Sequence, residues 1–221
     1  MAFAKKLVIF DCDGVLVDSE PHSIAVLVKV MGDLGIAMDE AGAYERFLGR
    51  SLADVTDYMR DDHGLAVGDD FANSIRTDLF ARFRAELKPI PGIMEALDGL
   101  TQQRCVASSS QLERIRLSLT VTGLSDRLEP HIFSAQMVKN GKPAPDLFLH
   151  AASEMGVAPA DCVVIEDSPA GIQAAKAGGM TVFAFTGGSH TSARAAYRSE
   201  IEALSPDLIF DRMADLPRLL G

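Results

Sequence analysis

Two aspartates stand two residues apart near the start of the chain, directly after a short apolar run. In the stretch VIFDCDGVLVDSE, Asp11 and Asp13 flank Cys12, and Gly14 follows. Side chains alternate along an extended segment, so both carboxylates are expected on one side and Cys12 on the other, packed in the core. Two crowded carboxylates raise the pKa of at least one of them unless a positive group lies beside them. The spacing therefore predicts a site for a cation.

Further polar residues follow other apolar runs of the same kind. Ligands of doubly wound parallel sheets bind beyond the carboxyl ends of the strands, so these residues should converge with the two aspartates. The converging residues are the serine cluster of Ser108, Ser109 and Ser110, then Lys142, and Glu166 with Asp167. The predicted site has more carboxylates than cationic groups, and a dry cleft tolerates such an excess only with a bound cation. Carboxylate oxygens beside a substrate phosphate are the usual setting for magnesium, so we expect Mg²⁺.

Six short apolar runs predict the strands that position these residues. They are residues 7–10, 105–107, 132–133, 162–165, 181–185 and 208–210. The spacing after residue 90 leaves room for a helix between most neighbours, and continuous apolar strands that alternate with helices indicate a parallel sheet covered on both faces. The expected fold class is therefore α/β, with a doubly wound, Rossmann-like parallel sheet.

The segment after the first strand has helical periodicity instead. Three apolar stripes with helical spacing occur there: Ile24, Leu27, Val28, Met31 and Leu34; Leu52, Val55 and Met59; and Phe71, Ile75, Leu79 and Phe83. We expect residues 18–87 to form an α-helical cap inserted into a catalytic core made of residues 1–17 and 88–221. Pro91 is expected to open the next helix.

Composition and charge exclude several classes of function. The chain has 221 residues, a net charge of −10 and a pI of about 4.9, which argues against nucleic acid or an anionic membrane as a partner. We expect no signal peptide and no membrane span, because the N-terminal apolar run is too short and no run of 18 apolar residues occurs. The odd number of cysteines predicts reduced, buried thiols in a cytoplasmic protein.

Four motifs of the chain resemble those of a known superfamily in order and spacing. The motifs are DCDGVLVDSE, ASS, GKPAPDLF and EDSPAGIQAAKAGG. They are similar to the four signature motifs of the haloacid dehalogenase superfamily. More narrowly, the chain looks like the sugar-phosphatase and β-phosphoglucomutase-like branch with a helical cap. The resemblance covers nearly the whole chain.

The resemblance implies roles for the core residues of the site. Asp11 is expected to be the nucleophile that forms an aspartyl-phosphate, and Asp13 the general acid and base. Ser108 would hydrogen-bond the transferring phosphoryl group, with Ser109 as a further phosphate contact. Lys142 would hold the nucleophile and the phosphate.

The resemblance also implies the metal ligands. Asp167 would bind Mg²⁺ together with the carboxylate of Asp11 and the backbone carbonyl of Asp13. Glu166 is expected as a further ligand, either directly or through water. Arg50, in the segment LGRS of the cap, is the candidate substrate contact, and a solvated surface arginine is the alternative for this residue.

Several nearby residues are expected to have structural roles. Ser110 to Glu113 fits a capping box, so Ser110 is assigned to a helix start and Ser108 to the phosphate. Ser168 and Pro169 predict the N-cap and first residue of a helix that ends at Gly178–Gly179. The five histidines follow no metal-ligand spacing. His190, in the segment GGSH after a predicted strand, is therefore not assigned to the site.

The predicted function is a magnesium-dependent phosphohydrolase acting on a small phosphorylated metabolite, such as a sugar or sugar-acid phosphate. The alternative is a β-phosphoglucomutase-type isomerase that uses the same aspartyl-phosphate. The resemblance disfavours it, because Ser23 stands where the mutases have a cap histidine, with His22 one place earlier. The arginine of LGRS also follows Gly49 directly, whereas Leu52 occupies the position that is arginine in the mutases. A dehalogenase proper is not expected to have an aspartate at position 13.

A non-enzymatic alternative is a phospho-accepting receiver module, which also combines an acidic cluster with a lysine. Such modules consist of a single sheet unit of about 100–150 residues. They have no cap after the first strand, so the long helical insertion of this chain favours the enzyme.

Overall fold

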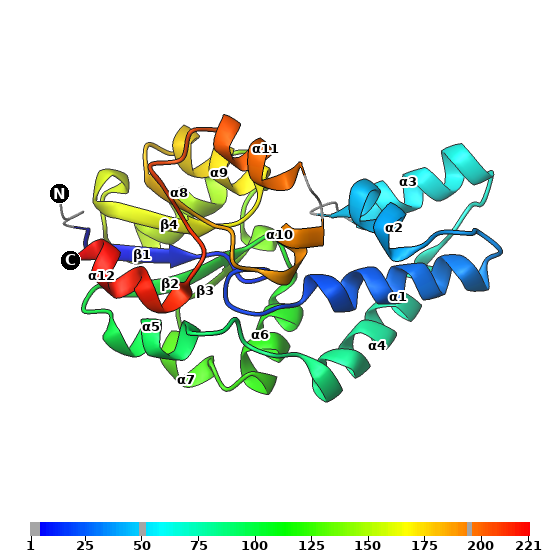
Figure 1. Ribbon diagram of the computed structural model, residues 1–221, viewed down its shortest axis with the longest axis horizontal. Helices are drawn as coiled ribbons and strands as arrows, with labels where there is room; N and C mark the ends of the chain where they lie inside the picture. The colour runs from blue at the N-terminus through cyan, green and yellow to red at the C-terminus, as the bar shows by residue number, and fades with distance from the viewer. Residues whose placement is uncertain (1–4, 49–51, 194–195) are drawn as a thin grey trace.

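A six-stranded parallel sheet forms the centre of the structure (Figure 1). The computed structural model describes residues 5–48, 52–193 and 196–221. In spatial order the strands are β3 (Ile132–Ser134), β2 (Gln103–Ser108), β1 (Leu7–Phe10), β4 (Cys162–Glu166), β5 (Thr181–Phe185) and β6 (Leu208–Phe210). The α/β fold class is confirmed, and all six predicted apolar runs form strands.

The strand order places β1 and β4 side by side at the point where the connections change direction. From β1 the chain continues to β2 and β3 on one side, then returns to β4 on the other side of β1. Phe10 is level with Val106 of β2 and with Ile165 of β4. The residues that follow these strands therefore emerge together at one edge, which is where doubly wound sheets bind ligands.

Helices cover both faces of the sheet because the strands are apolar on both sides. Val8 and Phe10 point into one apolar cluster, whereas Leu7 and Ile9 point into the other. The first cluster is covered by α5 (Ile93–Gly99), α6 (Leu112–Val121), α7 (Ser125–Leu128) and α12 (Leu216–Leu220). The second is covered by α8 (Asp146–Glu154), α9 (Pro169–Ala177) and α11 (Tyr197–Ala203). The short α10 (Ser189–Ala193) follows β5, and three 3₁₀ turns lie at Ala135–Met137, Pro159–Asp161 and Met213–Asp215.

Four helices between β1 and α5 extend beyond the sheet, to the right in Figure 1. They are α1 (Glu20–Asp33), α2 (Glu40–Phe47), α3 (Leu52–His63) and α4 (Asp69–Glu86). They share an apolar cluster that includes Leu27, Met31 and Met59. The chain leaves and re-enters the sheet region through two paired segments, in which the Asp18 amide donates to the Lys88 carbonyl. The domain boundaries at 17/18 and 87/88 remain a prediction.

The helix α1 differs from its predicted apolar stripe. Leu34 lies past the end of the helix and is 41% exposed, so its assignment to the stripe was wrong. Val26 and Val30 are buried instead, within the cluster of the sheet, while Leu27 and Met31 face the cluster of the four helices. The helix is buried on two faces because it packs between these two clusters, and one stripe cannot describe such a helix.

Two further expectations can be compared with the structure. The helix α5 begins at Ile93 and not at Pro91, because Gly92 adopts a positive φ of 85° and turns the chain first. A side chain at this glycine would also lie 2.9 Å from the backbone nitrogen of Ala214.

The thiols Cys12, Cys105 and Cys162 are free and buried, as predicted. None of the described helices is long and apolar enough to cross a membrane.

Candidate active site

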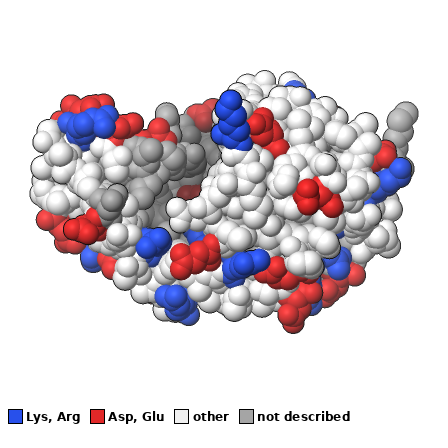
Figure 2. All heavy atoms as spheres, turned by 180° about the vertical axis from the view of Figure 1, so that it is seen from behind, with Lys and Arg blue, Asp and Glu red and all other residues white. Residues whose placement is uncertain are grey.

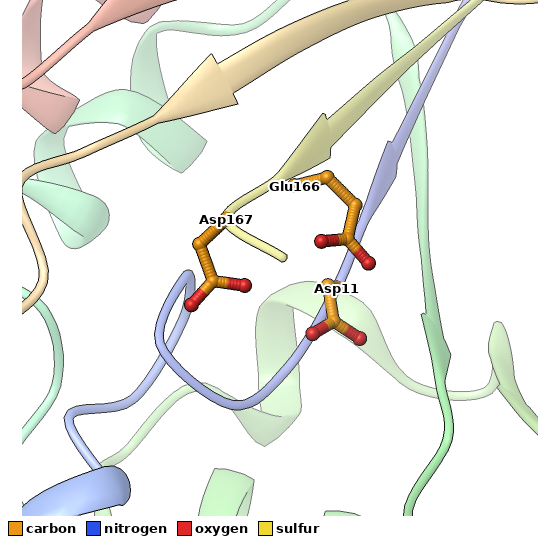
Figure 3. A group of neighbouring side chains, drawn as sticks. All are labelled: Asp11, Glu166 and Asp167. Carbon is orange, nitrogen blue, oxygen red and sulfur yellow. The ribbon is translucent and has the colours of Figure 1, made fainter. Parts of the chain in front are cut away.

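Three carboxylates meet at the carboxyl ends of β1 and β4 (Figure 3). Asp11 follows β1, Glu166 is the last residue of β4, and Asp167 comes directly after it. One carboxylate oxygen of each lies within 4.8 Å of the others, and all three residues are buried. The two neighbouring strands end at the same level, which brings these groups together. More than 150 positions separate Asp11 from the other two residues in the sequence.

Lys142 provides a positive charge to two of these carboxylates. Its Nζ lies 2.8 Å from Oδ1 of Asp11 and 2.7 Å from Oε1 of Glu166, and its side chain is only 4% exposed. Burial alone would lower the pKa of this lysine, but the two carboxylates outweigh burial, and the pKa of Lys142 is raised. Lys142 is therefore a buried residue of the site and not a solvated loop residue.

Asp13 has a different set of polar partners from Asp11. Its carboxylate accepts hydrogen bonds from Oγ of Ser19 at 2.5 Å, Oγ of Ser110 at 2.6 Å and Nη2 of Arg114 at 2.9 Å. Burial opposes ionisation of this group, but the charge of Arg114 and the two hydroxyls outweigh burial and lower the pKa of Asp13. Cys12 points away from the two aspartates into the apolar core, as alternation predicted.

The assignment of Ser110 to a helix cap was wrong. The helix α6 begins at Leu112 after the N-cap residue Gln111, whose own side chain makes no capping hydrogen bond. The Ser110 hydroxyl donates to Asp13 instead, because an ionised carboxylate is a stronger acceptor than a neutral group. Ser108 is also buried at the site, and its Oγ accepts a hydrogen bond from the Ser110 amide at 3.1 Å. Ser109 is exposed and lines the cavity above the carboxylates.

The start of α9 holds Glu166 in place. Oε2 of Glu166 accepts hydrogen bonds from the backbone amide of Ser168 at 2.7 Å and from its hydroxyl at 2.9 Å. The same hydroxyl accepts from the Gly171 amide, which confirms Ser168 as N-cap and Pro169 as first helical residue. A side chain at position 171 would lie 1.7 Å from Oε1 of Glu166, so the glycine makes room for this carboxylate.

Sequence reasoning missed two basic residues of the site. Arg114 of α6 contacts Asp13 and stacks over the ring of Phe83 from α4, with 5.4 Å between guanidinium and ring centroid. His190 is fully buried, and its Nε2 lies 3.0 Å from Oδ2 of Asp167. For Arg114 no local pattern distinguished it from a surface helical arginine, whereas the segment GGSH after a strand was a usable signal for His190.

A cavity of about 1080 Å³ lies above these groups, between the sheet edge and the helices α1 to α4. Figure 2 shows a hollow in the surface between the rest of the molecule and these helices, which lie at the left of that view. Glu20, Ser23, Asn73 and Arg76 are polar residues of the four helices that line it. Burial, followed by the charge of Asp13, raises the pKa of Glu20 to about 7.

The cap residues considered in the sequence have different outcomes. Arg50 lies outside the described residues. Ser23 lines the cavity, and its Oγ lies 3.4 Å from Nη2 of Arg114. His22, one position earlier, packs against Phe83 and lies 3.7 Å from Glu86. The backbone rotation between neighbouring helical residues thus directs His22 away from the cavity.

The carboxylate group fits a hard divalent cation. Its donors are all oxygen atoms, which magnesium prefers. Zinc sites use nitrogen and sulfur donors more often. Burial raises the pKa of Asp11, and the neighbouring charges of Glu166 and Asp167 add to the effect despite Lys142. Arg114 pairs with Asp13, so the excess of negative charge is smaller than the sequence predicted. The excess is confined to the three carboxylates, which are therefore the part of the site that fits a cation.

Comparisons with known proteins agree with this geometry. The family model of haloacid dehalogenase-like hydrolases matches residues 5–179. The 6-phosphogluconate phosphatase of Escherichia coli is 32% identical over 184 residues, which cover 83% of each chain. The fructose-1-phosphate phosphatase of the same organism is 31% identical, over 78% of this chain and 92% of the relative.

Solved structures extend the match to nearly the whole chain. A haloacid dehalogenase-like protein of Agrobacterium tumefaciens is 35% identical with a TM-score of 0.86, and the match covers 98% of this chain and 97% of the other. A family hydrolase of Deinococcus radiodurans, solved with bound phosphate and sodium, is 30% identical with a TM-score of 0.79, over 96% and 93% of the two chains. With its sheet, its buried carboxylates and these matches, the chain belongs to the haloacid dehalogenase-like hydrolase family.

Proposed function

We propose that the protein is a phosphatase that hydrolyses small phosphorylated metabolites through a phosphorylated Asp11. The observation that carries the proposal is the position of the Asp11 carboxylate. It lies at the floor of the cavity, 2.8 Å from Nζ of Lys142 and beside two further carboxylates. Such a group can attack a phosphorus atom that is held by cationic and hydroxyl groups.

In the first step, a carboxylate oxygen of Asp11 attacks phosphorus and the bond to the ester oxygen breaks. The leaving oxygen takes a proton from Asp13 and departs as an alcohol. Lys142 and the Ser108 hydroxyl hold the phosphoryl oxygens, and Ser109 supplies a further contact. In the second step, water attacks the phosphorus of the aspartyl-phosphate, Asp13 takes a proton from it, and inorganic phosphate leaves.

Asp13 must change its surroundings during this cycle. In the structure Arg114, Ser110 and Ser19 keep this carboxyl group ionised, since together they lower its pKa. Protonation for the first step therefore requires that some of these contacts loosen when substrate occupies the cavity. Ser19 is the N-cap residue of α1, so its contact with Asp13 depends on the position of the first cap helix.

We propose Mg²⁺ as the cofactor, held by the carboxylates of Asp11 and Asp167 and the backbone carbonyl of Asp13. Glu166 would assist directly or through water. When bound, the ion neutralises charge that develops on the phosphoryl oxygens. The residues of the chain contribute oxygen donors that are fixed by the ends of β1 and β4 and by Lys142.

We propose phosphorylated sugars or sugar acids as the substrate class. The support comes from the relatives, whose names specify 6-phosphogluconate and fructose 1-phosphate, and from the cavity. Its cap side presents the carboxylate of Glu20, the hydroxyl of Ser23 and the side chains of Asn73 and Arg76, which suit a polyhydroxylated and partly anionic molecule. Arg50 remains a proposed substrate contact.

The test is to follow phosphate release from a panel of hexose, pentose and sugar-acid phosphates, with magnesium and with excess chelator. We expect turnover of some panel members with magnesium and none with chelator. Calcium should replace magnesium poorly, because its larger and more flexible coordination can engage the Asp11 oxygen that must attack. Undiminished turnover in chelator would refute the metal assignment, and no turnover of any phosphomonoester would refute the phosphatase.

A further inference from the structure

His190 is a buried histidine next to the carboxylates, and the proposed chemistry does not use it. The residue is fully buried, and its Nε2 lies 3.0 Å from Oδ2 of Asp167. Among the described residues, neither Nδ1 nor Nε2 has a partner with the geometry of a hydrogen bond. Within that part of the chain, the close polar contact of the ring is therefore the one with Asp167.

Two glycines from distant parts of the sequence make room for this imidazole ring. A side chain at Gly14 would lie 2.9 Å from Cε1 of His190 and 1.9 Å from Oδ2 of Asp167. A side chain at Gly188 would lie 2.7 Å from the same Cε1 atom. The ring thus lies between the turn after Asp13 and the turn after β5. A residue larger than glycine in either turn would occupy the space of the ring.

The start of the helix α10, which carries His190, is fixed by local hydrogen bonds. Oγ1 of Thr191 donates to the carbonyl oxygens of Thr186 and Gly188, at 2.7 Å each. The hydroxyl of Ser189 donates to Oδ1 of Asp18 at 2.7 Å. These contacts hold the backbone on both sides of His190, so the direction of the ring is set before any ligand binds.

Tyr197 of α11 fixes the other end of the same aspartate. Its hydroxyl donates to the backbone carbonyl of Asp167 at 3.1 Å, and its ring packs edge-on against His190 with 5.5 Å between the centroids. The C-terminal segment thus contacts Asp167 at both its backbone and its side chain. His190 contacts one carboxylate oxygen of Asp167, Oδ2. This contact fixes the direction of the other oxygen, Oδ1.

We infer that His190 is a positioning residue that orients the carboxylate of Asp167 for the divalent cation, with Tyr197 fixing the backbone beside it. The inference rests on the magnesium site of the proposed function. A partner in the second coordination layer fixes the direction of a ligating carboxylate, and its removal typically weakens metal affinity or activity by about 10–100-fold. The carboxylates alone would still form a site, but a less ordered one.

The experiment measures cation affinity without turnover, by titrating the purified protein with Mn²⁺ and recording the free ion by electron paramagnetic resonance. We expect His190→Leu to raise the dissociation constant for Mn²⁺ by about 10-fold or more. His190→Gln should remain within about 3-fold of the unsubstituted protein, because its amide N–H can still reach Asp167, whereas the shorter His190→Asn should resemble His190→Leu. The half-saturating magnesium concentration for phosphate release should follow the same order, with a smaller change in kcat at saturating magnesium.

The matched control is His131→Leu, since His131 is exposed and precedes β3 at the opposite edge of the sheet. It should bind Mn²⁺ as the unsubstituted protein does. If His190→Leu does not fold, the comparison of the Gln and Asn variants decides. Equal affinities for all His190 variants, or a Gln variant as weak as the Asn variant, would overturn the inference. Failure of the unsubstituted protein to bind Mn²⁺ would instead refute the metal site itself.

Discussion

At the scale of single residues, two aspartates that are two positions apart have opposite surroundings. Asp11 is buried beside Lys142 and two carboxylates, and burial raises its pKa. Asp13 has Arg114 and two serine hydroxyls around it, and these lower its pKa although its partial burial opposes ionisation. Pairs of carboxyl groups with divergent environments commonly divide the roles of a reaction between them. The contacts here support the division into nucleophile and acid/base.

Replacement of Asp11 by asparagine should abolish turnover. An amide cannot form the aspartyl-phosphate, so kcat/KM for the best sugar phosphate should fall by more than about 10³-fold. The fold should persist, because the amide oxygen can still accept from Lys142. The measurement is phosphate release together with thermal unfolding of both proteins.

The matched control for this prediction is Cys12→Ala. Cys12 lies between the two aspartates in sequence but points into the core, so its loss should leave turnover in place. A homogeneous sample of Asp11→Asn with near-normal activity would show that the nucleophile is another group. Loss of activity in a folded Cys12→Ala protein would point to a cysteine mechanism.

At the scale of elements, the tip of β4 and the start of α9 form one unit. The Ser168 hydroxyl accepts from the Gly171 amide as N-cap and donates to Glu166, while Glu166 also accepts from Lys142. The residues that begin the helix thus also fix a carboxylate of the site. A change at this helix start should therefore affect both stability and the carboxylate cluster.

Ser168→Ala removes the N-cap and one hydrogen bond to Glu166. We expect the free energy of unfolding to fall by about 1 kcal/mol from the cap, and by more if the Glu166 contact is lost as well. Urea denaturation in the presence of chelator measures this without any contribution from metal binding.

Ser153→Ala in α8 serves as the comparison, because Ser153 is exposed and far from the sheet edge. Its unfolding free energy should change by less than about 0.5 kcal/mol. If both substitutions had the same small effect, the described hydrogen bonds of Ser168 would not contribute measurably to stability.

At the scale of the whole molecule, the cavity between the sheet edge and the four helices determines what happens to the aspartyl-phosphate. A mutase must keep water away until the sugar returns for the phosphate, whereas a phosphatase admits water. The cap position of the mutase histidine is Ser23 here, which lines the cavity, and His22 is directed away from it. The cavity therefore lacks that histidine at the position from which it could act.

We predict that free phosphate accumulates when the protein receives β-glucose 1-phosphate with a trace of the 1,6-bisphosphate. Water should capture the phosphoryl group, since the cap presents a serine where the mutases present a histidine. The measurement follows phosphate and glucose 6-phosphate in the same reaction. Stoichiometric glucose 6-phosphate without phosphate release would establish the mutase instead.

The sequence by itself determined the strands and the residues that follow them. A strand buried on both faces must be apolar throughout, and the polar residues that end it then mark the ligand edge of the sheet. This reasoning assigned the site residues Asp11, Lys142, Glu166 and Asp167. It also assigned Ser168 as the N-cap of a helix. The family resemblance then supplied their expected roles.

Only the tertiary structure decided the partners of these residues. Arg114, Ser110 and His190 lie on elements whose local patterns equally fit a surface arginine, a helix cap and a packed histidine. Their contacts with Asp13 and Asp167 join positions 23 to 101 residues apart. Local patterns cannot encode such pairings, because the close approach of the turns around Gly14 and Gly188 arises only when β1, β4 and β5 pack side by side.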